Sequence, residues 1–428
     1  MFKNTVFSII IAVVFILISC GNGTKKSAHF KDEKVTADAI NTENNGSILP
    51  IENTISAIKV GANETSKYLP LLKGKRVGVV GNQSSVIFKK EKLNKTLKYT
   101  HLVDSLLSLN VNVKKVFSPE HGFRGTADAG EIIKDGLDPK TKLPIISLYG
   151  DNKKPKPTQL EGLDFIIFDI QDVGVRFYTY ISTLHYVMEA CAEAGIPLIV
   201  LDRPNPNGQY IDGPILEKAN TSFVGMHPIP VAHGMTIGEY AKMINGEKWL
   251  DKGIQCDLTV IPMSNYNHQM QYSLPIKPSP NLPNDQAITL YPSLCFFEGT
   301  NVSVGRGTSK QFQIYGSPEM DKTFYDFQFM PQPNEGAKTP PHLGVLCYGV
   351  DLSKAEVKPS LHLKYLIDAY QHSKNKKSFF NSFFVKLAGT AKLRTQIEEG
   401  LSEAQIKASW AEGLANFKNV RNKYLIYK

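Results

Sequence analysis

The chain has little cysteine, and its cysteines form no motif. Among 428 residues there are five, at Cys20, Cys191, Cys256, Cys295 and Cys347, without a C-x-x-C pair. Close pairs mark zinc and redox centres, and dense cysteine marks disulfide scaffolds. The sequence therefore predicts neither, and the four cysteines after Cys20 are expected to be small buried side chains.

Signatures of cofactor and nucleophile chemistry are also missing. The loop after the first expected strand reads GVVGNQSS rather than G-x-G-x-x-G, and VGRGTSK lacks the spacing and ending of a phosphate loop. No G-x-S-x-G elbow is present to carry a serine nucleophile. The histidines are dispersed, and Asp169 with Asp172 is the nearest approach to paired metal ligands. We therefore expect no cofactor and no metal ion.

A conspicuous apolar run lies at the N-terminus, in residues 1–19. It is short for a membrane-spanning helix and has the length of a signal-peptide core. The residues LIS before Cys20 resemble a bacterial lipobox, in which the cysteine is lipidated. Residues 20–55 are polar and aperiodic, as in a flexible tether. We therefore expect a lipoprotein of the bacterial cell envelope, periplasmic or outer-membrane associated, whose membrane contact is a lipid anchor.

The charge balance gives little indication of a polyanionic partner. The formal net charge is +9, but lysine pairs such as Lys25–Lys26 and Lys153–Lys154 stand in loop-like segments. No recognition helix, zinc finger or basic stripe with interleaved aromatics is present. We expect no nucleic-acid binding, and nothing in the sequence predicts an oligomeric state.

From Lys75 onward, short runs rich in valine and isoleucine alternate with segments of helical period. Fully apolar strands that alternate with helices predict a parallel sheet with helices on both faces. The pattern predicts a Rossmann-like α/β domain over 56–280 and a smaller α+β domain over 281–428, with a proline-rich crossing between them. Expected strands are 76–80, 111–117, 143–150, 164–170, 197–201, 256–263 and 344–350; expected helices are 100–109, 178–194, 235–247, 361–371 and one beginning at Ser402.

Polar residues follow the expected strands of the first domain at their carboxyl ends. In open α/β sheets, ligands bind in the crevice at that edge. Groups that are far apart in the sequence are therefore expected to form one site. The groups are Asn82 and Gln83, Glu120 and His121, Tyr149, Asp169 with Gln171 and Asp172, and Asp202 with Arg203 and Asn205.

The densest of these stretches is VFSPEHGFRG, at 116–125, where Glu120 lies on a loop constrained by proline and glycine. Carboxylate acid–base chemistry on a glycosidic bond fits this stretch best, because such cleavage needs an acid and a second group at the sugar centre. Asp172 and Glu298 are alternative second carboxylates. Arg124, Arg176 and Arg306 exceed what a neutral sugar needs and suggest a substrate carboxylate; the alternative for each is an internal salt bridge, with Asp128, Glu131 or Asp172 as partner.

Five motifs together resemble the exo-β-N-acetylmuramidase family of peptidoglycan glycoside hydrolases. They are VVGNQSS, VFSPEHGFRG, LEGLDFIIFDIQDVGVRFYTY, LDRPNPNG and CFFEGTNVSVGRGT, and the resemblance extends from about Tyr68 to the C-terminus. It implies a Rossmann-like domain and a smaller C-terminal domain with the active site in the cleft between them, and a catalytic glutamate in SPEHG, here Glu120. It also implies release of N-acetylmuramic acid, whose lactyl carboxylate gives the arginines a ligand, from the non-reducing end of peptidoglycan fragments.

The expected catalytic residues are thus Glu120 with Asp172 and Glu298. Two alternatives remain for the role of the second carboxylate, Asp172 or Glu298. It can act directly on the sugar, or it can steady an attack by the substrate's own acetamido group. A different class of function is a lipid-anchored protein that binds muropeptides without cleaving them. The expected substrate-binding residues are Asn82, His121, Arg124, Tyr149, Gln171, Arg176, Tyr178, Asn205 and Arg306.

Overall fold

The structure, a computed structural model, describes residues 57–89, 98–124 and 135–428. The predicted signal peptide, lipidated Cys20 and tether lie outside the described residues, as do Asp128 and Glu131. Residues 55–428 form one compact unit.

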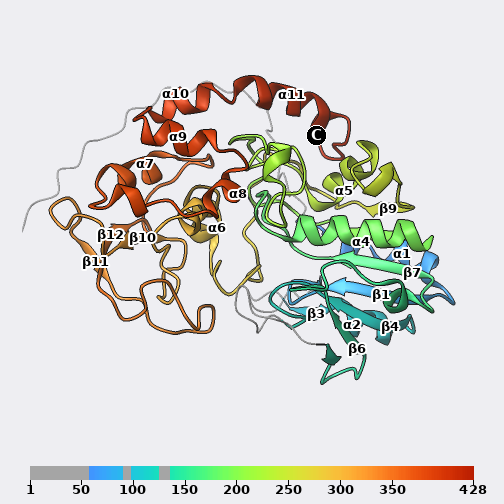
Figure 1. The fold of residues 1–428 in the computed structure, drawn as a ribbon. Helices are drawn as coiled ribbons and strands as arrows, with labels where there is room; N and C mark the ends of the chain where they lie inside the picture. The colour runs from blue at the N-terminus through green and yellow to red at the C-terminus, as the bar shows by residue number, and fades with distance from the viewer. Residues whose placement is uncertain (1–56, 90–97, 125–134) are drawn as a thin grey trace, which may run out of the picture. The chain divides into compact units, whose positions relative to one another are not determined.

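The first part of the fold is a seven-stranded sheet in the order β5-β6-β4-β1-β7-β8-β9 (Figure 1). Its neighbouring strands pair in parallel except β5, which pairs antiparallel with β6 at the edge. Numbered along the chain, the parallel strands have the order 3-2-1-4-5-6 of a doubly wound Rossmann sheet. The strands are β1 (Arg76–Gly81), β4 (Asn112–Ser118), β5 (Gly136–Leu137), β6 (Pro144–Ser147), β7 (Phe165–Asp169), β8 (Leu198–Leu201) and β9 (Leu258–Ile261).

Side chains of each central strand alternate between two hydrophobic layers. In β7, Ile166 and Phe168 join the layer beneath α4 (Tyr180–Ala194) and α5 (Ile237–Gly246), whereas Ile167 packs with α1 (Thr65–Leu72) and α2 (Leu102–Ser108). This period of two is what a strand buried on both faces requires. The predicted α/β class is therefore confirmed. A short α3 (Pro157–Leu160) and 3₁₀ turns η1 (Gly61–Asn63), η2 (Lys218–Asn220) and η3 (Asp251–Gly253) complete this part.

Two features of this part show how far local sequence predicts structure. The predicted capping box at the start of α5 is confirmed, because Thr236 Oγ1 accepts from the Glu239 amide and the Glu239 carboxylate accepts from the Thr236 amide. The sequence did not predict the hairpin of β2 (Val86–Phe88) and β3 (Tyr99–His101), whose strands are too short for a periodic signal.

The second part has a three-stranded antiparallel sheet in the order β10-β12-β11. Short helices lie above it and to one side in the view of Figure 1, which agrees with the predicted α+β class. The elements are α6 (Asp285–Leu294), η4 (Cys295–Gly299), β10 (Ile314–Ser317), β11 (Phe327–Phe329), β12 (Cys347–Asp351), α7 (Lys364–Gln371), η5 (Lys376–Ser378), α8 (Phe384–Ala388), α9 (Lys392–Glu398), α10 (Glu403–Ala408) and α11 (Ala411–Asn422).

The helix expected to begin at Ser402 is divided in two. Its capping box with Gln405 is present, but α10 ends at Ala408 and α11 begins after Trp410. Trp410 and Phe417 are buried, as lone aromatics at helical spacing predict, and they join the same core as Val80 of β1. One hydrophobic core therefore joins the two parts, and the expected domain boundary near residue 280 stays a prediction.

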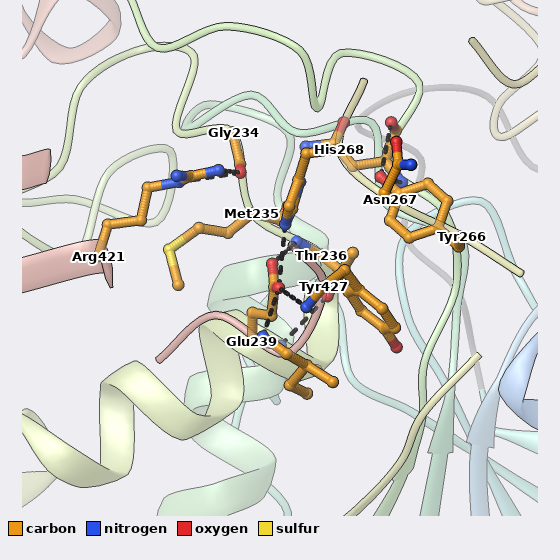
Figure 2. Close-up of polar contacts among 12 residues, drawn as sticks. Gly234, Met235, Thr236, Glu239, Tyr266, Asn267, His268, Arg421 and Tyr427 are labelled. Atoms are coloured by element: carbon orange, nitrogen blue, oxygen red, sulfur yellow. Dashed lines mark hydrogen bonds and ion pairs between the residues drawn. The ribbon is translucent and has the colours of Figure 1, made fainter. Parts of the chain in front are cut away.

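The end of the chain is held by two buried carboxylates, an arrangement we name the C-terminal clasp: Asp202, Glu239, Ile426 and Tyr427. Figure 2 shows Glu239 at its centre. The Glu239 carboxylate accepts from the backbone amides of Ile426 at 2.8 Å and Tyr427 at 3.2 Å and from His268 Nε2 at 3.0 Å. The Tyr427 hydroxyl donates to Asp202 Oδ2 at 2.6 Å. The clasp fixes the chain terminus to the carboxyl end of β8.

Candidate active site

A cavity of about 670 Å³ lies at the carboxyl ends of the parallel strands, within the size range of ligand pockets. Loops that follow β4, β6 and β7 line it on one side, and η4 with the loop after it lines it on the other. Both parts of the fold therefore contribute to one pocket. Its lining includes Glu120, His121, Tyr149, Tyr178, Thr179, Tyr180, Asn281, Tyr291, Glu298, Asn301, Arg306, Phe312, His342 and Phe383.

A tight turn after β4 presents Glu120 to this pocket. His121 and Gly122 both have positive φ, 70° and 80°, and the Gly122 amide donates to the Pro119 carbonyl at 3.2 Å. A histidine in this left-handed region is uncommon, and such strain gathers at functional sites. Thr179 Oγ1, at the start of α4, donates to Glu120 Oε2 at 2.9 Å.

Tyr149 meets Glu120 from the loop after β6. Its phenol is hydrogen-bonded to the Glu120 carboxylate, and burial together with that negative charge raises the pKa of Tyr149. The phenol therefore stays protonated and remains a hydrogen-bond donor at neutral pH. Two hydroxyls, from Thr179 and Tyr149, orient the Glu120 carboxylate.

Glu298 approaches from η4. Arg306 Nη1 donates to its Oε1 at 3.3 Å, and Cys295 Sγ lies 3.5 Å from its Oε2. Desolvation raises the pKa of Glu298 above its usual value, and the negative charge of Glu120 acts in the same direction; the charge of Arg306 opposes both. Glu120 therefore lies close enough to Glu298 to influence the ionisation of Glu298.

Aromatic rings form one wall of the cavity. Tyr291 packs edge-on against Phe177 at 5.5 Å, Tyr178 at 5.9 Å and Phe312 at 4.9 Å. The Tyr178 hydroxyl donates to the Pro278 carbonyl at 2.9 Å, which fixes its ring. Such a wall provides an apolar surface beside polar groups, which suits a sugar ring with one less polar face.

Six predicted site residues line this cavity together. They are Glu120, His121, Tyr149, Tyr178, Glu298 and Arg306. The other six predicted residues do not line it, and their contacts explain why.

Arg124 differs from the predicted substrate clamp. Its guanidinium donates to Asp138 from Nε at 3.1 Å and from Nη2 at 2.7 Å, and Nη2 is also 3.4 Å from Asp104. Burial alone would raise the pKa of Asp138, but Arg124 and Thr141 lower it to about 2. Arg124 therefore anchors the loop that carries Glu120, through an internal ion pair.

Arg176 also differs from its prediction. It is fully buried, and its Nη atoms donate to the carbonyls of Pro214, Ile229, Leu387 and Ala388 at 2.7–2.9 Å. Burial lowers the pKa of Arg176 to about 9. Because its two Nη groups donate to carbonyls of the loops after β8 and of α8, Arg176 joins the two parts of the fold and does not line the pocket.

Asp172 is buried outside the pocket lining. Its Oδ2 accepts from the Gly174 amide at 2.7 Å, and burial raises the pKa of Asp172 to about 7. Gly174 has a φ of 76°, so the carboxylate stabilises a turn that only glycine adopts readily. The structure thus leaves Glu298, of the two expected second carboxylates, beside Glu120.

Asn82, Gln171 and Asn205 use their amides within the loops. Asn82 Nδ2 donates to the Tyr180 hydroxyl at 2.9 Å, Gln171 Nε2 to the Pro204 carbonyl at 2.6 Å and Asn205 Nδ2 to the Met235 carbonyl at 2.9 Å. Irregular loops bury backbone carbonyls that need donors, and the amides of Gln171 and Asn205 supply two of them. None of the three residues lines the pocket.

Several lining residues were missed by the sequence reasoning. Thr179 stands inside the motif LEGLDFIIFDIQDVGVRFYTY, where a hydroxyl three positions past an arginine gives no separate signal. Asn281, Asn301, His342 and Phe383 come from loops and from a helix cap, where no periodicity marks a function. Their convergence is a property of the tertiary structure.

The described residues can also be compared with the requirements of a metal site and of a membrane-spanning helix. Across 57–89, 98–124 and 135–428, no three His, Cys, Asp or Glu side chains gather as a set that could hold a metal ion. Within the same ranges, no helix combines the length and the apolar character needed to cross a bilayer.

Comparison with known proteins gives concordant results over almost the whole described chain. Residues 77–286 match the family model "Exo-beta-N-acetylmuramidase NamZ, N-terminal", and residues 289–427 match its C-terminal counterpart. The peptidoglycan β-N-acetylmuramidase NamZ of Bacillus subtilis (strain 168) is 42% identical over 382 residues, which cover 84% of this chain and 89% of that protein.

Two solved structures, both DUF1343 family proteins from Bacteroides fragilis NCTC 9343, share the fold. One is 47% identical with a TM-score of 0.78, and the other is 28% identical with a TM-score of 0.73. Each comparison covers 87% of this chain and 99% of the other.

Two carboxylates that line one pocket at the carboxyl ends of a Rossmann-like sheet fit the chemistry of a glycoside hydrolase, and the family match assigns the chain to that class. The chain belongs to the exo-β-N-acetylmuramidase NamZ family. The resemblance noted in the sequence motifs is thereby confirmed.

Proposed function

We propose that this chain releases N-acetylmuramic acid from the non-reducing end of peptidoglycan fragments. The family and the similarity to the Bacillus subtilis enzyme support this activity. The structural observation that carries it is the pocket in which Glu120 and Glu298 reach the same cavity from different parts of the chain, beside Arg306.

Glu120 is the proposed acid and base. Its carboxylate is held by the hydroxyls of Thr179 and Tyr149 on a strained turn, so it has one orientation in which to give a proton to the leaving oxygen. Glu298 is the proposed second carboxylate. It steadies the positive charge that develops at the anomeric carbon, or activates the group that attacks there.

Arg306 is the proposed ligand of the lactyl carboxylate. It is the one of the three predicted arginines that lines the described pocket, and its side chain is 20% exposed. A guanidinium shared between Glu298 and a substrate carboxylate holds the sugar by its acid group close to the catalytic pair. This geometry favours muramic acid over sugars without a carboxylate.

The direct test uses a disaccharide with N-acetylmuramic acid at its non-reducing end. The wild type is expected to release the monosaccharide, and Glu120→Gln is expected to lose at least about 100-fold in kcat while keeping its fold. Glu335→Gln, an exposed glutamate outside this pocket, is the matched control. Saturable binding without product from the wild type would instead support a muropeptide-binding protein.

The anomeric form of the first product assigns the second group. An inverted product identifies Glu298 as a base that activates water, and a retained product identifies a nucleophile. Glu298→Ala with added azide separates the two retaining routes. Azide restores turnover if the carboxylate itself attacks, whereas an N-thioacetyl substrate blocks turnover if the acetamido group attacks.

We also propose that the protein is a lipoprotein anchored in the bacterial cell envelope through Cys20. The support is the apolar run of residues 1–19 and the LIS before Cys20. Metabolic labelling with a fatty-acid analogue is expected to mark the wild type and not Cys20→Ser. Label retained in Cys20→Ser would remove this proposal and leave the proposed reaction untouched.

A further inference from the structure

The thiol of Cys295 lies behind the Glu298 carboxylate, and the reaction described above gives it no role. Its Sγ is 3.5 Å from Glu298 Oε2, while Arg306 Nη1 is 3.3 Å from Oε1. Cys295 is 1% exposed, whereas the Glu298 side chain is 28% exposed. The carboxylate is therefore held at both oxygens, by a cation on one and by a buried thiol on the other.

The local backbone explains this contact. Both residues belong to the 3₁₀ helix η4, in which side chains three positions apart stand one above the other. The next residue, Gly299, packs directly on α8, because a Cβ built there would lie 2.4 Å from the Phe384 Cα. The turn therefore lies directly against α8 with no room for a side chain at Gly299, and Cys295 and Glu298 keep the register of η4.

We propose that Cys295 is a positioning residue for Glu298, whose S–H donates to Oε2, fixes the plane of the carboxylate and favours its ionised form. The inference rests on the proposed role of Glu298. An ionised carboxylate only accepts hydrogen bonds, so the proton of this contact belongs to the sulfur. Burial and the charge of Glu298 raise the pKa of the Cys295 thiol well above its usual value, which keeps that proton in place.

The groups that face Glu298 set the direction of its response. Arg306 and Cys295 favour the ionised form, whereas desolvation and Glu120 disfavour it. Tyr291, from α6, is hydrogen-bonded to the Cys295 sulfur and also lines the pocket. Removing the S–H donor therefore raises the pKa of Glu298, and activity that needs the carboxylate charged then begins at a higher pH.

The test compares Cys295→Ala, Cys295→Ser and Cys347→Ala by the pH profile of kcat/KM on the muramic-acid disaccharide. Cys347 is an equally buried cysteine of β12 whose thiol lies 3.6 Å from the Val345 carbonyl, so it controls for the loss of a buried thiol. The acidic limb is expected to move up by about half a pH unit in Cys295→Ala. It should stay at or below the wild-type position in Cys295→Ser, which keeps a donor, and should not move in Cys347→Ala.

An unmoved limb in Cys295→Ala, or an equal upward shift in the alanine and serine variants, overturns the inference. A second measurement does not depend on turnover, and it uses a cysteine variant only as the spectroscopic reference. The infrared S–H stretching band of Cys295, assigned by subtraction of Cys295→Ser, is expected to move to higher frequency in Glu298→Gln, because a neutral amide is a weaker acceptor.

The two readouts separate this inference from the proposed reaction. A band that does not respond to Glu298→Gln overturns the positioning contact, whatever the activity. A band that responds in a Glu298→Gln enzyme with wild-type turnover preserves the contact but removes the proposed role of Glu298, and with it the functional part of the inference.

Discussion

Replacing Arg176 with methionine tests whether this arginine stabilises the fold or binds substrate. In the structure its four carbonyl contacts join the loops after β8 to α8. Each charge-assisted hydrogen bond contributes about 1.5–3 kcal/mol, but the arginine is also a costly buried charge, and methionine restores part of the packing. We expect a net loss of about 3–5 kcal/mol in the free energy of unfolding, because four buried carbonyls lose a donor at about 1–3 kcal/mol each and removal of the buried charge offsets part of that loss.

The assay is thermal unfolding together with KM for the muramic-acid disaccharide. At about 2 °C per kcal/mol, the lower end for large domains, the expected loss lowers Tm by about 6–10 °C. KM measured well below Tm should remain within about twofold of the wild type. Arg394→Met, which removes an exposed arginine paired with Glu398, is the control and should change stability by less than about 0.5 kcal/mol.

An unchanged Tm with a tenfold higher KM would refute this reasoning. Such a result would return Arg176 to the substrate-binding role that its position after β7 suggests. A lower Tm with a normal KM would establish it as a structural link between the two parts of the fold.

Three further perturbations follow from buried polar groups. Arg124→Ala should lower kcat more than it raises KM, because the loop that carries Glu120 loses its anchor to Asp138. Steady-state kinetics tests this prediction. A change in KM alone would instead indicate that Arg124 contacts the substrate. Asp172→Asn should stabilise the protein at pH 8 relative to wild type and not at pH 4, by at most about 4 kcal/mol, since the folded pKa of Asp172 is raised from 3.8 to about 7. The sign follows from the raised folded-state pKa of Asp172. The stability that the neutral Asp172 carboxyl allows is fully present below its unfolded-state pKa and is lost as the pH rises through its folded-state pKa. Equal changes in stability at both pH values in chemical denaturation would contradict this prediction. Tyr427→Phe should cost about 1–3 kcal/mol, because the buried Asp202 carboxylate loses one donor and keeps only those from Thr236 and its other neighbours, and an unchanged urea midpoint would contradict the importance of the clasp.

The sequence predicted the sheet well because its signals are local. Strands such as β7 are apolar throughout, and α4 repeats its apolar residues at helical spacing. A short stretch of sequence is therefore enough to predict each of these elements. The short strands β2, β3, β10 and β11 were missed, because three or four residues carry too little pattern. The helix expected to begin at Ser402 is broken at Ser409 and Trp410, and the Trp410 side chain is buried in the core at this break.

Of the site residues that the sequence predicts, half line one pocket and half do not. Glu120, Tyr149 and Arg306 do reach one pocket, as the rule about carboxyl ends of strands indicates. Arg176 and Asp172 stand at the same edge but turn inward, because loops at that edge also contain backbone groups that need partners. The predicted residues that line the pocket and those that do not both include carboxylates and arginines, and both include residues that follow strands of the sheet. Only their tertiary contacts distinguish them.

The C-terminal clasp ties the residues around Tyr427 to the first part of the fold. Tyr427 is 225 positions from Asp202, and Ile426 is 187 positions from Glu239. Contacts so far apart along the chain require large loops to close, so we expect the clasp to form late in folding. Removing residues 426–428 would take away the amides of Ile426 and Tyr427 and the Tyr427 phenol as donors to the two carboxylates, and would leave the donors from Thr236, Gly238 and His268.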